Sequence, residues 1–139
     1  MNILIIDAQG GGMGRQLITA IKKEFTEVEV TAVGSNALAT SNMLKAGADH
    51  AATGENAVVV GCRKADVIIG PIGIVIADSM YGEITPVMAV AVGQSNARKL
   101  LIPMDQCDNI IIGIGNHSMN FLVSSVIEEL EEIIEFHKE

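Results

Sequence analysis

The sequence predicts an α/β fold in which a mainly parallel, doubly wound sheet lies between two layers of helices. Strand and helix patterns alternate along the whole chain, and their short connections favour right-handed crossovers. Hydrophobic residues make up 49% of the 139 residues but aromatic residues only 3%, so the core must be aliphatic, as is typical of parallel strands covered by helices. We expect residues 1–139 to form one domain, because no linker, repeat or low-complexity tract divides them.

The first two strand–helix units follow directly from the pattern. An apolar strand over residues 3–6 leads through a glycine cluster into a helix over residues 13–24, whose apolar residues recur at helical spacing. A second strand over residues 28–33 is followed by the turn Gly34-Ser35-Asn36, which offers a helix cap. The helix expected over residues 37–46 then ends at Gly47.

The middle of the chain is less regular. Thr53 is a plausible cap for a short helix over residues 54–62, and a buried strand over residues 67–69 ends at Gly70-Pro71. Residues 73–84 carry no clear pattern.

The C-terminal third begins with Thr85-Pro86, since proline at the first helical position loses no hydrogen bond. The helix is expected to run to about Arg98, with a strand over residues 87–92 as the alternative. Two last strands over residues 100–102 and 110–114 are expected to pair across a polar turn of residues 104–109. An amphipathic helix of about four turns closes the chain.

Charge, cysteine content and hydropathy exclude several classes of function. A net charge of −8 at pH 7 and nine scattered basic residues argue against a nucleic-acid surface. Cys62 and Cys107 form no C-x-x-C pair, which favours a reducing compartment. The N-terminus lacks a signal peptide's basic region, and the longest apolar run, residues 67–77, is too short for a membrane span. We therefore predict a soluble, cytoplasmic protein without nucleic-acid or membrane partners.

The glycine cluster is the strongest chemical signal in the chain. Glycines between a buried strand and a helix suit a turn whose backbone amides face a phosphate, and the helix dipole adds partial positive charge there. In a doubly wound, Rossmann-like sheet the ligand lies beyond the carboxyl ends of the strands, where several loops converge. The candidate ligand-binding residues are Asp7, Gln9, Gly10, Gly11, Gly12, Met13, Gly14, Arg15, Ser35, Asn36, Thr53, Gly70 and Pro71.

Each candidate also has a purely structural interpretation. Close packing of a helix on a strand would explain the glycines, and a local hydrogen bond within the turn would explain Asp7. Helix capping would explain Ser35, Asn36 and Thr53. Arg15 would then be an ordinary solvated side chain, and Gly70-Pro71 a tight turn.

The sequence carries few of the residue patterns that catalysis requires. The turn resembles the G-x-x-x-G-x-G turn of short-chain dehydrogenases with Ala8 in place of the first glycine, but no lysine lies four residues after Tyr81, the sole tyrosine. The strand over residues 28–33 also lacks the acidic residue that would hold an adenosine ribose. We find no acid–base pair, metal-ligand spacing, P-loop or nucleophile elbow. A second glycine turn is expected over residues 113–118, and His117 is its only candidate proton carrier. The cofactor therefore stays open, with NAD(P) or another nucleotide as candidates.

Four segments together resemble a family of short bacterial proteins of unknown function with a Rossmann-like D-[GA]-Q-G-G-G-x-G motif. That family usually carries glycine at the position of Ala8 and isoleucine at the position of Met13. The resemblance supplies no activity, but it implies that the four segments belong together on the crevice side of the fold. They are residues 7–16, 36–48, 52–57 and 69–73.

Three hypotheses follow. The favoured one is a nucleotide- or phosphate-binding module that uses the glycine turn of residues 8–15. The second is a small enzyme acting on a nucleotide or phosphorylated metabolite, which would need His117 or Asp7 near the crevice. The third is a homo-oligomeric structural protein, with an interface formed by the last helix or by residues 73–92.

Overall fold

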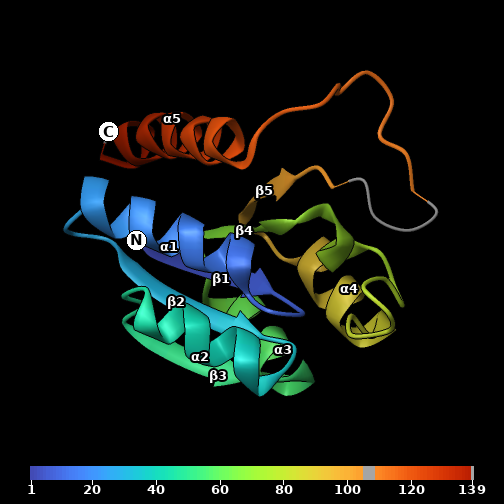
Figure 1. Cartoon of the computed structure of the whole chain (residues 1–139). Coiled ribbons are helices and arrows are strands. Elements are labelled where there is room, and N and C mark those ends of the chain that lie inside the picture. Colours follow the sequence, from blue (N-terminus) through green and yellow to red (C-terminus); the bar gives the residue numbers. More distant parts are fainter. Residues whose placement is uncertain (105–108, 139) are drawn as a thin grey trace.

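The computed structural model describes residues 1–104 and 109–138, which form a five-stranded, all-parallel sheet with helices on both faces (Figure 1). The strand order is β3-β2-β1-β4-β5, so the chain reverses its direction of winding between β1 and β4. This arrangement confirms the predicted three-layer, doubly wound α/β fold. The switch point between β1 and β4 is where such folds bind ligands.

The strands and helices have the following bounds. The strands are β1 (Asn2–Asp7), β2 (Glu29–Gly34), β3 (His50–Thr53), β4 (Val67–Pro71) and β5 (Arg98–Ile102). The helices are α1 (Gly12–Glu24), α2 (Ala37–Lys45), α3 (Glu55–Lys64), the 3-10 turn η1 (Ile72–Val75), α4 (Pro86–Gln94) and α5 (Met119–Lys138).

Two aliphatic cores lie on the two faces of the sheet. Alternate residues of β1 divide between them, because successive strand side chains point to opposite faces. Ile3 and Ile5 join the core under α1, α2 and α5, whereas Leu4 and Ile6 join the core under α3 and α4. Figure 1 shows α5 beside α1, where Leu130 is fully buried, so the apolar stripe of the last helix is largely used within the chain.

Several predicted elements are confirmed, most with shifts of one or two residues at their ends, whereas α4 ends about four residues earlier than expected. Asn36 caps α2 by accepting a hydrogen bond from the amide of Ala39, 2.9 Å away. Thr85 caps α4 in the same manner, at 3.1 Å from the amide of Met88, and the alternative strand over residues 87–92 is wrong. α4 ends at Gln94, because Ser95 and the following residues extend into β5.

The structure corrects three predictions. Strand β3 was not predicted, because its four residues show no apolar alternation and lie at the sheet edge. Thr53 therefore ends a strand, and α3 is preceded by Gly54 without a side-chain cap.

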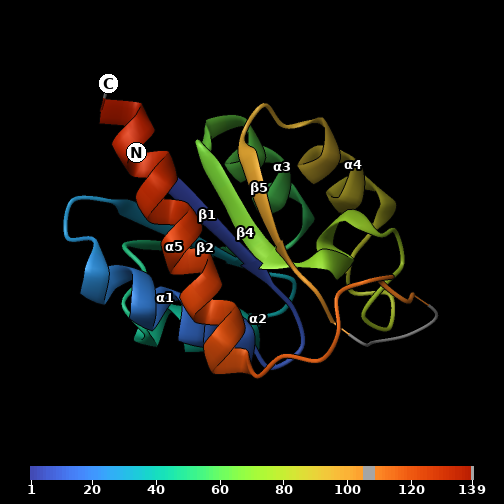
Figure 2. The ribbon, with the colours of Figure 1, turned by 90° about the horizontal axis from the view of Figure 1, so that it is seen from above.

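The predicted strand over residues 110–114 and its pairing with residues 100–102 are also wrong. β5 pairs with β4, whereas residues 110–114 form no strand and turn at residues 112–113, with Ile110 and Ile112 83% and 88% exposed. Most of the predicted polar turn, residues 105–108, lies outside the described residues. Figure 2 shows the described part of the connection to α5 passing along the carboxyl-end edge of the sheet.

Candidate functional site

The turn after β1 is organised by a buried carboxylate. Asp7, only 4% exposed, accepts hydrogen bonds from the amide of Ala8 at Oδ1 (2.8 Å) and from the amide of Gly14 at Oδ2 (2.7 Å). Burial raises the pKa of this carboxyl, partly offset by the two amides, and the charge of Glu83 raises it further. Asp7 thus joins the two ends of the glycine turn.

Two asparagines of the second unit hold the carbonyls of the turn. The side-chain amide of Asn36 donates to the carbonyl of Gln9 at 2.9 Å, and that of Asn42 donates to the carbonyl of Gly10 at 2.7 Å. Both carbonyls are therefore directed toward α2. Their partners explain how Gln9 is held at a φ of 53°, which non-glycine residues seldom adopt.

The four glycines fall into two pairs. Gly11 and Gly14 are required by packing: a Cβ on Gly11 would lie 2.8 Å from the Cα of Ala39, and one on Gly14 would collide with the sulfur of Met43. A Cβ on Gly10 or Gly12 would meet nothing within 4 Å. Packing therefore accounts for only half of the cluster.

The same turn presents amides without partners. The backbone N–H groups of Gly10, Gly12 and Met13 donate no hydrogen bond to any residue that the structure describes. The first turn of α1 contains no acidic residue, and its cap residue, Gly11, provides no side-chain acceptor. Free amides at the positive end of a helix form the arrangement that binds phosphates in other folds.

A side chain that the sequence did not single out completes this region. Glu83 Oε1 accepts hydrogen bonds from the amide of Gln9 (2.9 Å), the hydroxyl of Ser35 (2.6 Å) and the side-chain amide of Asn36 (2.8 Å). Burial alone would raise the pKa of Glu83, but the bonds from Ser35, Gln9 and Asn36 lower it below its usual value. Glu83 therefore connects the ends of β1 and β2.

The remaining predicted residues have other contacts. Thr53 bonds to the hydroxyl of Thr40, 2.7 Å away, at the edge of the sheet. Arg15 is exposed and lines a shallow pocket between α1 and α5. Gly70 and Pro71 end β4, and a Cβ on Gly70 would collide with the carbonyl oxygen of Ile6. Gly70 is thus explained by close packing of β4 on β1.

A pocket of about 430 Å³ opens beside the glycine turn. It lies between Met13 at the start of α1, Pro103 after β5 and His117 before α5. The ring of His117 stacks on Phe121 at 4.5 Å, and Nε2 contacts the carbonyl of Ile114 at 2.9 Å. Space for a ligand therefore exists next to the unpaired amides of the turn.

Comparison with known proteins identifies the family of this chain. Residues 2–135 match the model of the family described as "Domain of unknown function (DUF3842)". The chain belongs to this family. No curated protein matches it. One solved structure similar to it is a dodecameric FMN-dependent UbiX-like decarboxylase from Escherichia coli O157:H7, with 17% identity, a TM-score of 0.49 and coverage of 93% of this chain and 76% of that one.

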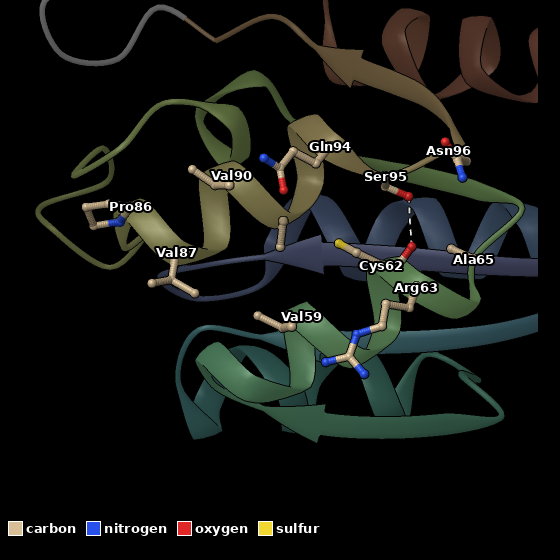
Figure 3. Close-up of a pocket in the computed structure, with 11 residues that line it drawn as sticks. Val59, Cys62, Arg63, Ala65, Pro86, Val87, Val90, Gln94, Ser95 and Asn96 are labelled. Atoms are coloured by element: carbon tan, nitrogen blue, oxygen red, sulfur yellow. Dashed lines mark hydrogen bonds between the residues drawn. The ribbon is translucent and has the colours of Figure 1, made fainter.

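A second pocket of this DUF3842 protein, larger than the one beside the glycine turn, lies elsewhere. A groove of about 660 Å³ separates α3 from α4, and Figure 3 shows Val59, Val87 and Val90 facing it. Arg63 is the only charged residue in its lining. Burial raises the pKa of Cys62 in this groove to about 11, so the thiol stays protonated at neutral pH and is a poor nucleophile.

Within residues 1–104 and 109–138 of the DUF3842 protein, no cluster of three or more histidine, cysteine or acidic side chains is placed to hold a metal ion. None of the helices described is both long and apolar enough to cross a bilayer.

Proposed function

We propose that the protein is a nucleotide-binding module that holds a ligand phosphate at the turn of residues 8–15. The observation that carries the proposal is the set of three unpaired amides, at Gly10, Gly12 and Met13, at the N-terminus of α1. The turn follows β1 at the switch point of a doubly wound sheet, which is the usual position of a phosphate in such folds. Open space over Gly10 and Gly12 lets a phosphate approach the backbone closely.

Binding is better supported than catalysis. Asp7 is committed to two backbone amides, so it is poorly placed to move a proton to or from a ligand. His117 is exposed and already contacts a backbone carbonyl. Among residues 1–104 and 109–138, neither of the side chains that the enzyme hypothesis names is therefore free to act as a proton carrier in its present contacts.

The test is thermal unfolding against NAD, NADP, AMP, ATP, GTP, FMN, sugar phosphates and inorganic phosphate. A ligand of the native state at 100 times its Kd should stabilise the protein by about 2.7 kcal/mol, which raises Tm by several degrees. If no compound raises Tm at millimolar concentration, phosphate binding at this turn is wrong.

A substitution at Gly12 tests whether the ligand-induced rise in Tm comes from binding at the turn of residues 8–15. Gly12→Val should abolish the ligand-induced rise in Tm while leaving the protein folded, because its side chain would occupy the open space over the amides. Gly93→Val is the matched control, since Gly93 also has open space around its Cβ position but lies in α4. Equal ligand stabilisation of Gly12→Val and the parent would refute the proposal.

A homo-oligomeric role is the second candidate, favoured by the composition of α4. Its residues are apolar on nearly all sides, and Val87 and Val90 are 51% and 53% exposed beside the groove against α3. A helix that is apolar all round is usually buried. Light scattering should give the mass of a multimer if a second copy covers this face, and a monomer would exclude this role.

A further inference from the structure

Glu83 places a carboxylate beside the carboxyl end of β2, an end at which β2 itself has no acidic residue. In doubly wound folds that bind dinucleotides, an acidic residue near the end of the second strand accepts hydrogen bonds from the ribose hydroxyls. Here β2 ends at Gly34 and is followed by Ser35 and Asn36, which are not acidic. The carboxylate bonded to Ser35 and Asn36 comes instead from the loop between η1 and α4.

The loop holds Glu83 in a defined place. The neighbours Met80 and Ile84 are 4% and 1% exposed, so both anchor the loop in the core under α3 and α4. The carbonyl of Ile84 accepts a hydrogen bond from the amide of Asp78 at 2.7 Å. Asp78, Met80 and Tyr81 all adopt positive φ, a conformation of higher energy that tertiary contacts must maintain.

One oxygen of Glu83 remains available. Oε1 carries all three hydrogen bonds, from Gln9, Ser35 and Asn36, whereas no donor among the described residues contacts Oε2. The side chain is half-buried rather than enclosed, so Oε2 can accept from a ligand. The amide of Gln9 links this carboxylate to the glycine turn, because Gln9 directly precedes Gly10, the first residue of the turn whose amide has no partner among the described residues.

We propose that Glu83 Oε2 accepts hydrogen bonds from the ribose hydroxyls of the bound nucleotide. The protein then selects nucleotides with a free 2′,3′-diol and rejects those with a 2′-phosphate, whose charge would face the carboxylate. This inference rests on the proposed function, because the ligand phosphate at the glycine turn sets where the ribose lies. Glu83 is thereby a specificity-determining residue supplied by a loop distant in sequence.

Glu83→Gln tests the inference with little change of shape. The glutamine Oε1 can still accept from Gln9, Ser35 and Asn36, so the loop should stay in place and Tm without ligand should change little. Its Nε2 replaces Oε2 and cannot accept a hydrogen bond from a hydroxyl. Glu55→Gln is the matched control: Glu55 lies at the same edge of the sheet and accepts from the hydroxyl of Thr85 at 2.7 Å, so the same charge is lost away from the turn.

Calorimetric titration should compare two ligand pairs, NAD with NADP and AMP with 2′-deoxy-AMP. We expect the parent and Glu55→Gln to bind the diol member of each pair at least about tenfold more tightly, as a hydrogen bond to a charged group implies. In Glu83→Gln that preference should fall below about threefold.

The outcomes separate the inference from the proposed function. Equal binding within both pairs by the parent, or binding of FMN alone, would overturn the role of Glu83 and leave phosphate binding intact. Tighter binding by Glu83→Gln would show that the carboxylate excludes the ligand, which also overturns the inference. If neither pair, nor any other phosphate compound, binds the parent, the proposed function itself fails.

Discussion

Two glycine-containing turns meet at the same edge of the sheet, one after β1 and one after β4, yet their glycines serve different needs. In the turn after β4, the Cβ of a residue at 70 would collide with the carbonyl of Ile6, and one at 73 would lie 3.1 Å from Ser79 Oγ. In the turn after β1, Gly11 and Gly14 are likewise packed, but Gly10 and Gly12 face open space. A glycine pattern in a sequence therefore combines glycines that packing requires with glycines that it does not, and only the structure separates the two kinds.

The largest expected effect lies in the turn after β4. Gly70→Ala should destabilise the protein by about 3 kcal/mol or prevent folding, because the new Cβ meets backbone that cannot move without disturbing the β1–β4 pairing. Urea unfolding followed by circular dichroism measures the loss. If the free energy of unfolding of Gly70→Ala is within about 0.5 kcal/mol of the parent value, β1 and β4 can move apart at little cost and this prediction is wrong.

A second prediction concerns the carboxylate that closes the turn after β1. Asp7→Asn should cost about 1–3 kcal/mol at acid to neutral pH, because the asparagine NH₂ would face the amide of Ala8 or Gly14. The loss of unfolding free energy caused by Asp7→Asn should become smaller as pH rises. Since burial raises the folded-state pKa of Asp7 above 3.8, its contribution is fully present below that value and declines as pH rises through the folded-state pKa.

Urea unfolding of parent and Asp7→Asn across pH 3 to 8 measures this dependence, with circular dichroism confirming that both start folded. The difference in unfolding free energy should shrink with increasing pH. A difference that grows with pH would mean that the two amides outweigh burial and that the folded-state pKa is lowered.

Much of the fold was predictable because local pattern and global topology agree. The buried strand over residues 3–6 and the cap at Asn36 were identified correctly from hydrophobic spacing and turn chemistry alone. The edge strand His50–Thr53 was missed because it is short and largely exposed. The isoleucines of residues 110–114 give the apolar pattern of a strand, but within the described residues the segment pairs with no strand of the sheet.

Only part of the candidate site was predictable, because sequence patterns locate the residues next to strands but not those in irregular loops. Asp7, the glycines, Ser35 and Asn36 adjoin strands, so a rule about strand ends finds them. Glu83 lies in a segment without periodicity, and its role depends on three positive-φ residues that no short motif specifies. Its sequence position marks it only as one more acidic loop residue.

The smallest effect should come from the two open glycines. Gly10 and Gly12 do not have positive φ, and an added Cβ would contact nothing, so alanine at either position fits the native backbone. We expect Gly10→Ala and Gly12→Ala to change stability by no more than about 0.5 kcal/mol, with a slight gain from reduced freedom of the unfolded chain. Gly11→Ala should be clearly destabilised in the same urea assay, since φ is 72° and Ala39 is in contact. If all three substitutions are equally harmful, the whole cluster serves packing, and the unpaired amides lose their significance as a ligand site.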